Sequence, residues 1–207
     1  MTNEKPSLVI IIDCWDSAKT QNRIDMMTNI RKFCFDTPSV KAIGLATYIS
    51  LRSEQVAIEE PWTPNSKELF HDTITWDFLR KNWENTEFVP DGKTHEIIQT
   101  MPIRPDQVQF SIWNTLQLMY YCNSINTSIQ NIFLLGIAWE VCLQYRPVGW
   151  KEIHSANEAN LFTTKKNIFS NLSCTLDETD QFVTEVSPPW IKLDNNLVML
   201  DKNQVTY

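Results

Sequence analysis

Apolar and polar positions follow one another along the chain in blocks that predict strands and helices in turn. The run SLVIIID (residues 7–13) is apolar and β-branched and ends in an acid, which is typical of a central strand buried on both faces. Between Thr20 and Phe35, apolar side chains recur at helical spacing and predict a helix. The segment SVKAIGLATYIS then predicts a second strand, from Val40 to about Tyr48. The chain thus opens with a strand–helix–strand unit.

A long polar region follows, and we expect it to cover the functional site. It runs from Leu51 to Pro90, carries Trp and Pro, and contains one short predicted helix in TITWDFLRKNW. Excursions of this length between core elements are more often functional than idle. After a turn at PDGK, the segment HEIIQT predicts a third strand. The segment from Gln109 to Ser124 has apolar residues at helical spacing and predicts a helix, with Ser111 as a candidate N-cap.

The last part of the chain predicts two further strands and a less regular tail. NIFLLG (residues 131–136) predicts the fourth strand, WEVCLQY begins a helix that Pro147 stops or bends, and ANLFTTK is a candidate fifth strand. Beyond Asn167 the pattern is weaker: SCTLDETDQFVTEV favours a helix, and PPWIKLDNNLVMLD favours a tail that packs on the surface. No internal repeat or linker divides the sequence, which predicts a single domain over residues 1–207.

The alternation of strands and helices predicts the α/β class, with a mostly parallel central sheet and helices on both faces. In such sheets, ligands bind beyond the carboxyl ends of the strands. Asp13 ends the first predicted strand and Gly136 ends the fourth. Both residues are therefore expected at the same edge of the sheet.

The composition excludes several classes of partner. With 43% hydrophobic and 21% charged residues, it is that of an ordinary globular protein. The net charge of −7 and the scattered basic residues argue against nucleic acid. The first apolar run, Leu8–Ile12, is far shorter than the roughly 20 residues that cross a bilayer, so no membrane is expected. The five cysteines form no CxxC pair and no secretion signal is visible, which indicates reduced thiols and a cytoplasmic location.

Cys142 is the first candidate for chemistry. A helix that begins at WEVCLQY places this thiol in its first turns, near the positive end of the helix, where a thiolate is stabilised. The expected position of Asp13 at the same edge of the sheet is a separate reason to consider it. The alternatives stay open: Cys142 as a small buried apolar residue, and Asp13 as a cap of the loop after its strand.

Asp13 at the end of the first strand, together with GIAWEVCL after the fourth, resembles the isochorismatase-like cysteine hydrolase superfamily. The residues from Gly136 to Leu143 match the order of the family signature, and the strand order and chain length are similar too. The resemblance covers roughly residues 7–166 and leaves 167–207 as a C-terminal extension. It implies a three-layer α/β/α fold with a Rossmann-like strand order.

The resemblance also implies a mechanism. Cys142 would be the nucleophile that attacks an amide or related carbonyl, and Asp13 the base that takes its proton. Backbone N–H groups near Ala138 and Cys142 would receive the oxyanion. The family has a cis peptide bond just before the small residue of the signature, which corresponds here to Ile137–Ala138.

Two of the departures of this sequence from the family pattern concern the candidate site residues. The third catalytic residue of the family is a lysine, commonly six residues before a Phe. Counting back from Phe110 gives Arg104, which is expected in place of the lysine, and counting from HEIIQT gives Thr100 or Met101. Trp15 stands where the family often has a polar residue, and with Trp139 it is expected to form a pocket wall. Aromatic residues at the ends of elements are also common in cores and interfaces.

The resemblance bears on ligands and assembly as well. The metal-binding nicotinamidases of the same superfamily use an Asp-x-His and a further His, and none of His71, His95 and His154 forms such a group. No metal and no cofactor are therefore expected. Members of the family commonly form oligomers with sites near subunit contacts, so a homo-oligomer with a small-molecule substrate is expected.

Three functions are compatible with these residues to different degrees. The first is a hydrolase of a small amide-like or related substrate that uses Asp13, Cys142 and Arg104. The second is a binding or scaffold protein that keeps the fold and has lost the chemistry, as the missing lysine suggests. A dinucleotide-binding protein is disfavoured, because DCWDSAK after the first strand contains no glycine-rich turn.

Overall fold

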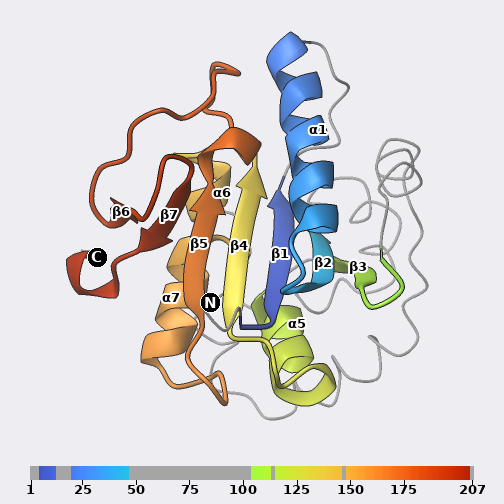
Figure 1. Ribbon diagram of the computed structural model, residues 1–207. Helices are drawn as coiled ribbons and strands as arrows, with labels where there is room; N and C mark the ends of the chain where they lie inside the picture. Colours follow the sequence, from blue (N-terminus) through green and yellow to red (C-terminus); the bar gives the residue numbers. More distant parts are fainter. Residues whose placement is uncertain (1–4, 13–19, 47–103, 113–114, 146–147, 206–207) are drawn as a thin grey trace, which may run out of the picture.

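The computed structural model describes residues 5–12, 20–46, 104–112, 115–145 and 148–205, and these form one mixed β-sheet with helices packed against it (Figure 1). The strand order is β3-β2-β1-β4-β5-β7-β6. The strands from β3 to β5 in this order pair in parallel, and β7 and β6 are antiparallel additions. The bounds are β1 Ser7–Ile12, β2 Val40–Ala46, β3 Val108–Ile112, β4 Asn131–Gly136, β5 Asn167–Asn171, β6 Trp190–Lys192 and β7 Leu197–Leu200.

The helices connect the parallel strands. Helix α1 begins after Thr20 because the hydroxyl oxygen of that residue accepts a hydrogen bond from the backbone N–H of Arg23 (3.3 Å). None of the helices in the described segments has the length and the apolar composition needed to cross a lipid bilayer. The bounds are α1 Gln21–Asp36, α5 Thr115–Tyr120, the π-helix η1 Tyr121–Ile125, α6 Cys142–Tyr145, α7 Trp150–Glu158, and the 3₁₀ helices η2 Leu172–Cys174 and η3 Lys202–Gln204.

The centre of the fold is β1, all of whose residues are buried. Its side chains alternate between two apolar clusters, because successive residues of a strand face opposite sides of the sheet. Leu8, Ile10 and Ile12 belong to one cluster, and Val9 and Ile11 belong to the other. Each fully buried side chain of this size contributes about 1.5–3 kcal/mol relative to exposure. The sequence pattern SLVIII therefore specifies a strand covered on both faces.

Different helices cover the two faces. Met26 and Ile30 of α1 belong to the same cluster as Val9 and Ile11. Leu118 of α5 and Ile153 and Ala156 of α7 belong to the other cluster. Figure 1 shows α1 on the near side of the sheet and α5 and α7 on the far side.

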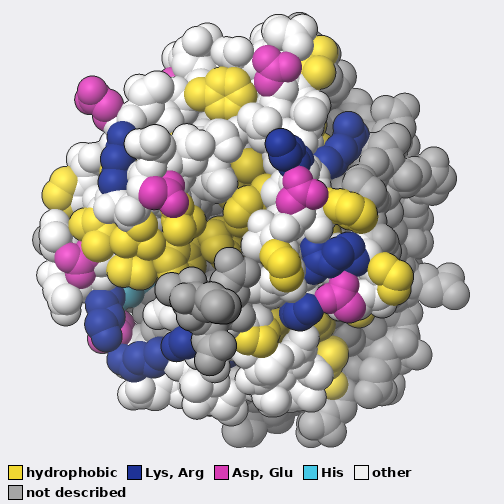
Figure 2. All heavy atoms as spheres, viewed as in Figure 1, with side chains coloured by type: hydrophobic (Ala, Val, Ile, Leu, Met, Phe, Trp, Pro, Cys, Tyr) yellow, Lys and Arg dark blue, Asp and Glu magenta, His cyan; other side chains and the backbone are white. Residues whose placement is uncertain are grey.

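Part of the near face carries apolar side chains that no described helix covers. Figure 2 shows them gathered over the region of β5, β7 and β6. Phe169 of β5 pairs with Met199 of β7, and Met199 pairs with Ile191 of β6, so their side chains share one face of the sheet. All three are only partly buried. They form an apolar row across the three strands.

The C-terminal segment is part of the sheet, which corrects the expectation of a surface tail beyond residue 187. Strand β7 pairs with β5, and Trp190 of β6 is buried in the same cluster as Leu8 and Ile10. The ring of Trp190 lies 4.8 Å from that of Trp139 and 6.3 Å from that of Trp150. The region from 167 to 205 therefore completes the core rather than lying on it.

Several other elements confirm or correct the sequence-based expectations. The first, second and fourth strands and the helix from residue 20 are confirmed. VQFSI is strand β3 rather than the beginning of a helix, so Ser111 is a strand residue and not an N-cap. The fifth strand begins at Asn167, after ANLFTTK, and η2 with two β-bridges replaces the helix expected after Asn171. The predicted strand HEIIQT and the region from Leu51 to Pro90 lie outside the described residues.

Replacing Trp190 tests whether the C-terminal strands belong to the core. Trp190→Ala should lower the free energy of unfolding by about 3–5 kcal/mol, because it leaves a cavity between Trp139 and Trp150. Urea unfolding followed by circular dichroism measures this change. The control is Leu193→Ala, whose side chain is 48% exposed and should change stability by less than about 0.5 kcal/mol. Equal stabilities of the two variants would contradict the packing of β6 into the core.

Candidate functional site

The carboxyl ends of β1 and β4 meet at one point of the sheet edge. The two strands pair in register from Ser7–Asn131 to Ile12–Gly136. Beyond the strands, the backbone N–H of Ile137 donates to the carbonyl oxygen of Ile12 (3.0 Å). The turn that leads to Cys142 therefore starts beside the last residue of β1. Asp13 and Trp15, which follow Ile12 in the sequence, lie outside the described residues.

Gly136 allows the backbone to adopt the conformation of this turn. Its φ of 121° lies in a region that residues with a Cβ atom avoid, so the glycine is needed at this position. The peptide bond between Ile137 and Ala138 is cis, which is the configuration that the family resemblance implies. The side chains of both residues are buried.

The C-terminal segment holds this turn through its backbone. The N–H of Leu176 donates to the carbonyl oxygen of Gly136 (3.0 Å), and the N–H of Trp139 donates to the carbonyl oxygen of Leu176 (3.0 Å). Leu176 thus bonds to the chain on both sides of the Ile137–Ala138 peptide. Leu176 is not recognisable from the sequence, because a contact made by backbone atoms leaves no trace in a side-chain pattern.

Cys142 is the first residue of α6 and is half-buried against the far-side cluster. The carbonyl oxygen of Ala138 accepts hydrogen bonds from the N–H groups of Val141 (3.3 Å) and Leu143 (3.0 Å), which folds residues 138–143 into a tight turn. The helix begins three residues later than WEVCLQY predicted and contains only four residues. A helix of one turn stabilises a thiolate less than the longer helix that was expected.

The other thiols of the described segments are in environments that suppress reactivity. Cys34, Cys122 and Cys174 are buried. Burial raises the pKa of Cys122 and of Cys174 to about 12. Burial, with a smaller contribution from Cys174, also raises the pKa of Cys34. These thiols stay protonated at neutral pH and are inert, whereas Cys142 is partly accessible.

Arg104 lies at the amino ends of the strands, whereas Cys142 follows the carboxyl end of β4. The expectation that Arg104 lies beside Cys142 is therefore corrected. Its Nε donates to Asp106 (3.0 Å), just before β3, and its side chain is mostly buried. Because these contacts are at the amino ends of β2 and β3, the guanidinium caps the C-terminal end of α1 and does not contribute to the Cys142 site. The guanidinium also donates to the carbonyl oxygens of Cys34 (3.0 Å), Phe35 (2.6 Å), Thr37 (3.1 Å), Pro38 (3.4 Å) and Val40 (2.7 Å).

Trp139 packs in the core, where a pocket wall was expected. Its ring is buried and contacts the ring of Trp190 at an interplanar angle of 44°. Trp190 in turn packs edge-on against Trp150. Such tilted and edge-to-face pairs add about 0.5–1.5 kcal/mol beyond the area that they bury. Trp139 therefore anchors the turn before Cys142 to the C-terminal strands.

In the segments that the structure describes, no three or more His, Cys, Asp or Glu side chains come together in a group that could hold a metal ion. His154 is buried in the middle of α7, and burial lowers the pKa of its imidazole.

The role of Arg104 as a structural cap can be measured directly. Arg104→Met keeps the apolar stem and removes the donors, so the free energy of unfolding should fall by about 2–3 kcal/mol in urea titrations. Lys165→Met removes one member of an exposed ion pair with Glu158 and should cost less than about 1 kcal/mol. An equal loss of unfolding free energy in the two variants would show that hydrogen bonds from the Arg104 guanidinium to these carbonyl groups do not stabilise the fold.

Comparison with models of known protein families, with curated proteins and with solved structures finds no match for this chain.

Proposed function

We propose that this chain is an isochorismatase-like cysteine hydrolase with a three-layer α/β/α fold, and that it acts on a small amide-like or related substrate through Asp13 and Cys142. The pairing of Ile12 with Gly136 is the observation that carries the proposal. Because β1 and β4 are parallel and end together, the chain continues from Ile12 and from Gly136 at the same edge of the sheet. The two apolar clusters on opposite faces of β1 support the layered arrangement.

In the proposed reaction, the Asp13 carboxylate takes the proton of the Cys142 thiol, and the thiolate attacks the substrate carbonyl carbon. The S–C bond forms as the C=O electron pair moves to oxygen. The N–H groups of Ala138 and Cys142 stabilise this oxyanion by about 3 kcal/mol each. The C=O bond then re-forms, the C–N bond breaks, and the amine leaves with the proton from Asp13. Water hydrolyses the thioester with Asp13 as base, which releases the acid and restores the thiol.

The second candidate is a binding or scaffold protein that keeps this fold without the chemistry. It is favoured by the position of Arg104, whose guanidinium hydrogen-bonds to carbonyl oxygens at the end of α1 and the start of β2, at the amino ends of the strands. The sequence then offers no cation in the place of the family lysine, since the other positions that counting gives are Thr100 and Met101. The single turn of α6 also weakens the acidification of Cys142.

The two functions predict different behaviour of the Cys142 thiol. In a hydrolase, iodoacetamide should alkylate Cys142 with a pH midpoint below the ~8.5 of an ordinary thiol, and much faster than Cys34, Cys122 and Cys174. Asp13→Asn should lower this midpoint by about one pH unit, because it removes a nearby negative charge that disfavours the thiolate. Mass spectrometry of the digested protein resolves each cysteine, including Cys14.

Asp16→Asn is the matched control, since it removes the second acid of the DCWD sequence and should leave the midpoint unchanged. A midpoint near that of an ordinary thiol in the wild type, with no response to Asp13→Asn, would overturn the hydrolase and support the scaffold. Release of an amine from a panel of small amides, lost in Cys142→Ala, would decide for the hydrolase.

We also propose that the chain forms a homo-oligomer in the cytoplasm. The support is the apolar row of Phe169, Met199 and Ile191, which the described helices leave partly exposed. A second copy that packs on this row would remove apolar area from water at about 25 cal/mol per Å².

Charge in the apolar row should therefore disrupt assembly. Met199→Lys should lower the mass measured by light scattering after size exclusion, because it places an ammonium in the contact. Leu193→Lys changes a side chain on the loop between β6 and β7 that is 48% exposed, and it should leave the mass unchanged. A wild-type chain that runs as a monomer at micromolar concentration would exclude the assembly.

A further inference from the structure

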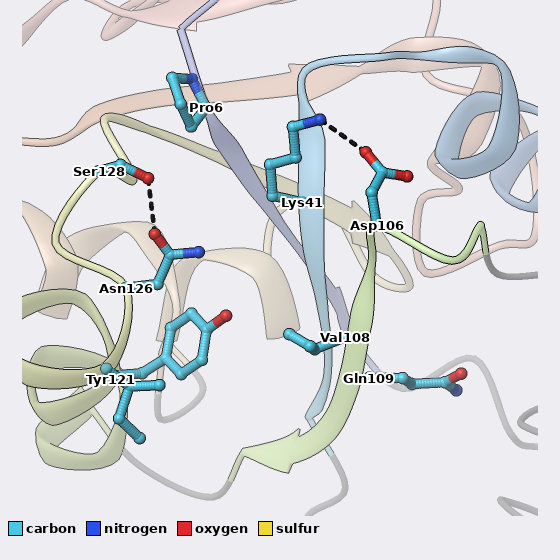
Figure 3. Close-up of a pocket in the computed structure, with 9 residues that line it drawn as sticks. Pro6, Lys41, Asp106, Val108, Gln109, Tyr121, Asn126 and Ser128 are labelled. Carbon is cyan, nitrogen blue, oxygen red and sulfur yellow. Dashed lines mark hydrogen bonds and ion pairs between the residues drawn. The ribbon is translucent and has the colours of Figure 1, made fainter.

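A pocket lies at the amino ends of the strands, at the opposite end of the sheet from Cys142. Its volume is about 610 Å³, and it opens between the beginning of β2 and β3 and the π-helix η1 (Figure 3). Pockets that hold small organic ligands typically measure roughly 300–1,000 Å³. None of its lining residues takes part in the proposed hydrolase site.

One side of this pocket is apolar. Val108 of β3 is 50% exposed and Ile125 of η1 is 48% exposed, and both line the pocket. Single exposed apolar residues are normal on protein surfaces and need no explanation. Here, however, two of the seven large apolar side chains that are exposed in the described segments face one cavity from separate elements. That arrangement provides an apolar surface for part of a ligand.

The opposite side carries two polar groups that converge on the pocket. Figure 3 shows the hydroxyl of Tyr121 and the amide nitrogen of Asn126 both directed into the space between η1 and β3. The hydroxyl of Ser128 donates to the amide oxygen of Asn126 (2.6 Å), which orients the amide nitrogen toward the pocket. Tyr121 is buried, and burial raises the pKa of its phenol more than the side-chain hydrogen bond with Asn126 lowers it, so the hydroxyl keeps its proton at neutral pH. The side chains of Tyr121 and Asn126 also hydrogen-bond to each other, so they form a fixed polar side of the pocket.

Two cations share one carboxylate beside this pocket: Lys41 and Asp106 line it, and Arg104 contacts Asp106 from outside the lining. One carboxylate, that of Asp106, accepts from both the Lys41 ammonium (2.6 Å) and the Arg104 Nε (3.0 Å). These two hydrogen bonds lower the pKa of the Asp106 carboxyl, so it stays ionised, yet one negative charge faces two positive ones. Lys41 is partly exposed. In a chain of net charge −7, such a local surplus attracts an anionic group.

We propose that this pocket binds a small amphipathic organic anion, with its apolar body against Val108 and Ile125 and its carboxylate or sulfonate toward Lys41. The apolar wall, the polar side formed by Tyr121 and Asn126 and the surplus of positive charge match the parts of such a ligand. The site is separate from the Cys142 site and does not depend on the function proposed for it.

The probe for this site is 8-anilinonaphthalene-1-sulfonate, which combines an apolar ring system with one sulfonate. Its fluorescence should rise saturably on titration with the full chain, with one probe bound per chain. Val108→Asp and Lys41→Gln should each raise the dissociation constant about tenfold, which corresponds to 1.4 kcal/mol. The matched controls are Leu193→Asp, which alters an equally exposed apolar residue, and Lys165→Gln, which removes a lysine elsewhere.

A neutral analogue separates the contribution of charge from that of apolar contact. N-phenyl-1-naphthylamine lacks the sulfonate, so Lys41→Gln should leave its affinity unchanged while Val108→Asp still weakens it. Circular dichroism checks that each variant is folded, and Val108→Thr serves if Val108→Asp does not fold, because it has nearly the same shape. The proposal is overturned if the control variants weaken the sulfonate probe as much as the pocket variants do, or if the wild-type chain does not bind it saturably.

Discussion

The burial of β1 on both faces is the constraint on which the rest of this structure depends. Leu8, Ile10 and Ile12 are committed to one apolar cluster, and Val9 and Ile11 to the other. A slip of one residue in the pairing with β4 would exchange the two sets and leave both clusters mismatched. The register between the two strands is therefore strongly specified. It is this register that brings Ile12 and Gly136 to the same point of the sheet edge.

Different kinds of contact stabilise the two ends of the strands. At the carboxyl edge, backbone hydrogen bonds from Leu176 and the packing of Trp139 on Trp190 hold the turn before Cys142. At the amino edge, the side chain of Arg104 holds the end of α1 through a series of carbonyl groups. A segment late in the chain thus supports one edge, and a residue just before β3 supports the other. The surroundings of Cys142 depend on residues that follow it in the sequence.

The sequence was sufficient to predict the elements whose pattern is long or wholly apolar, such as β1, β4 and α1. Strand β3 was missed because it is short and its alternation, VQFSI, was interpreted with the helical residues that follow. Strands β6 and β7 depend on pairing with β5, a contact between distant residues that local pattern does not reveal. Arg104 was misplaced for a similar reason: counting residues from Phe110 gives a position in the sequence but not the edge of the sheet on which it lies. Of the candidate site, the Gly136–Cys142 turn was identified, whereas its support by Leu176 was not.

The antiparallel strands at the end of the sheet also bear on colloidal behaviour. A sheet that ended at β5 would present open N–H and C=O groups beside an apolar face, which is a template for edge-to-edge aggregation. Here the outermost strand, β6, is only three residues long, follows two prolines and ends in Lys192, whose ammonium donates to the carbonyl oxygen of Thr184. A short strand that ends in a lysine offers little backbone for another chain to pair with. The last forty residues thus protect one side of the sheet from fibril-like growth, in addition to completing its core.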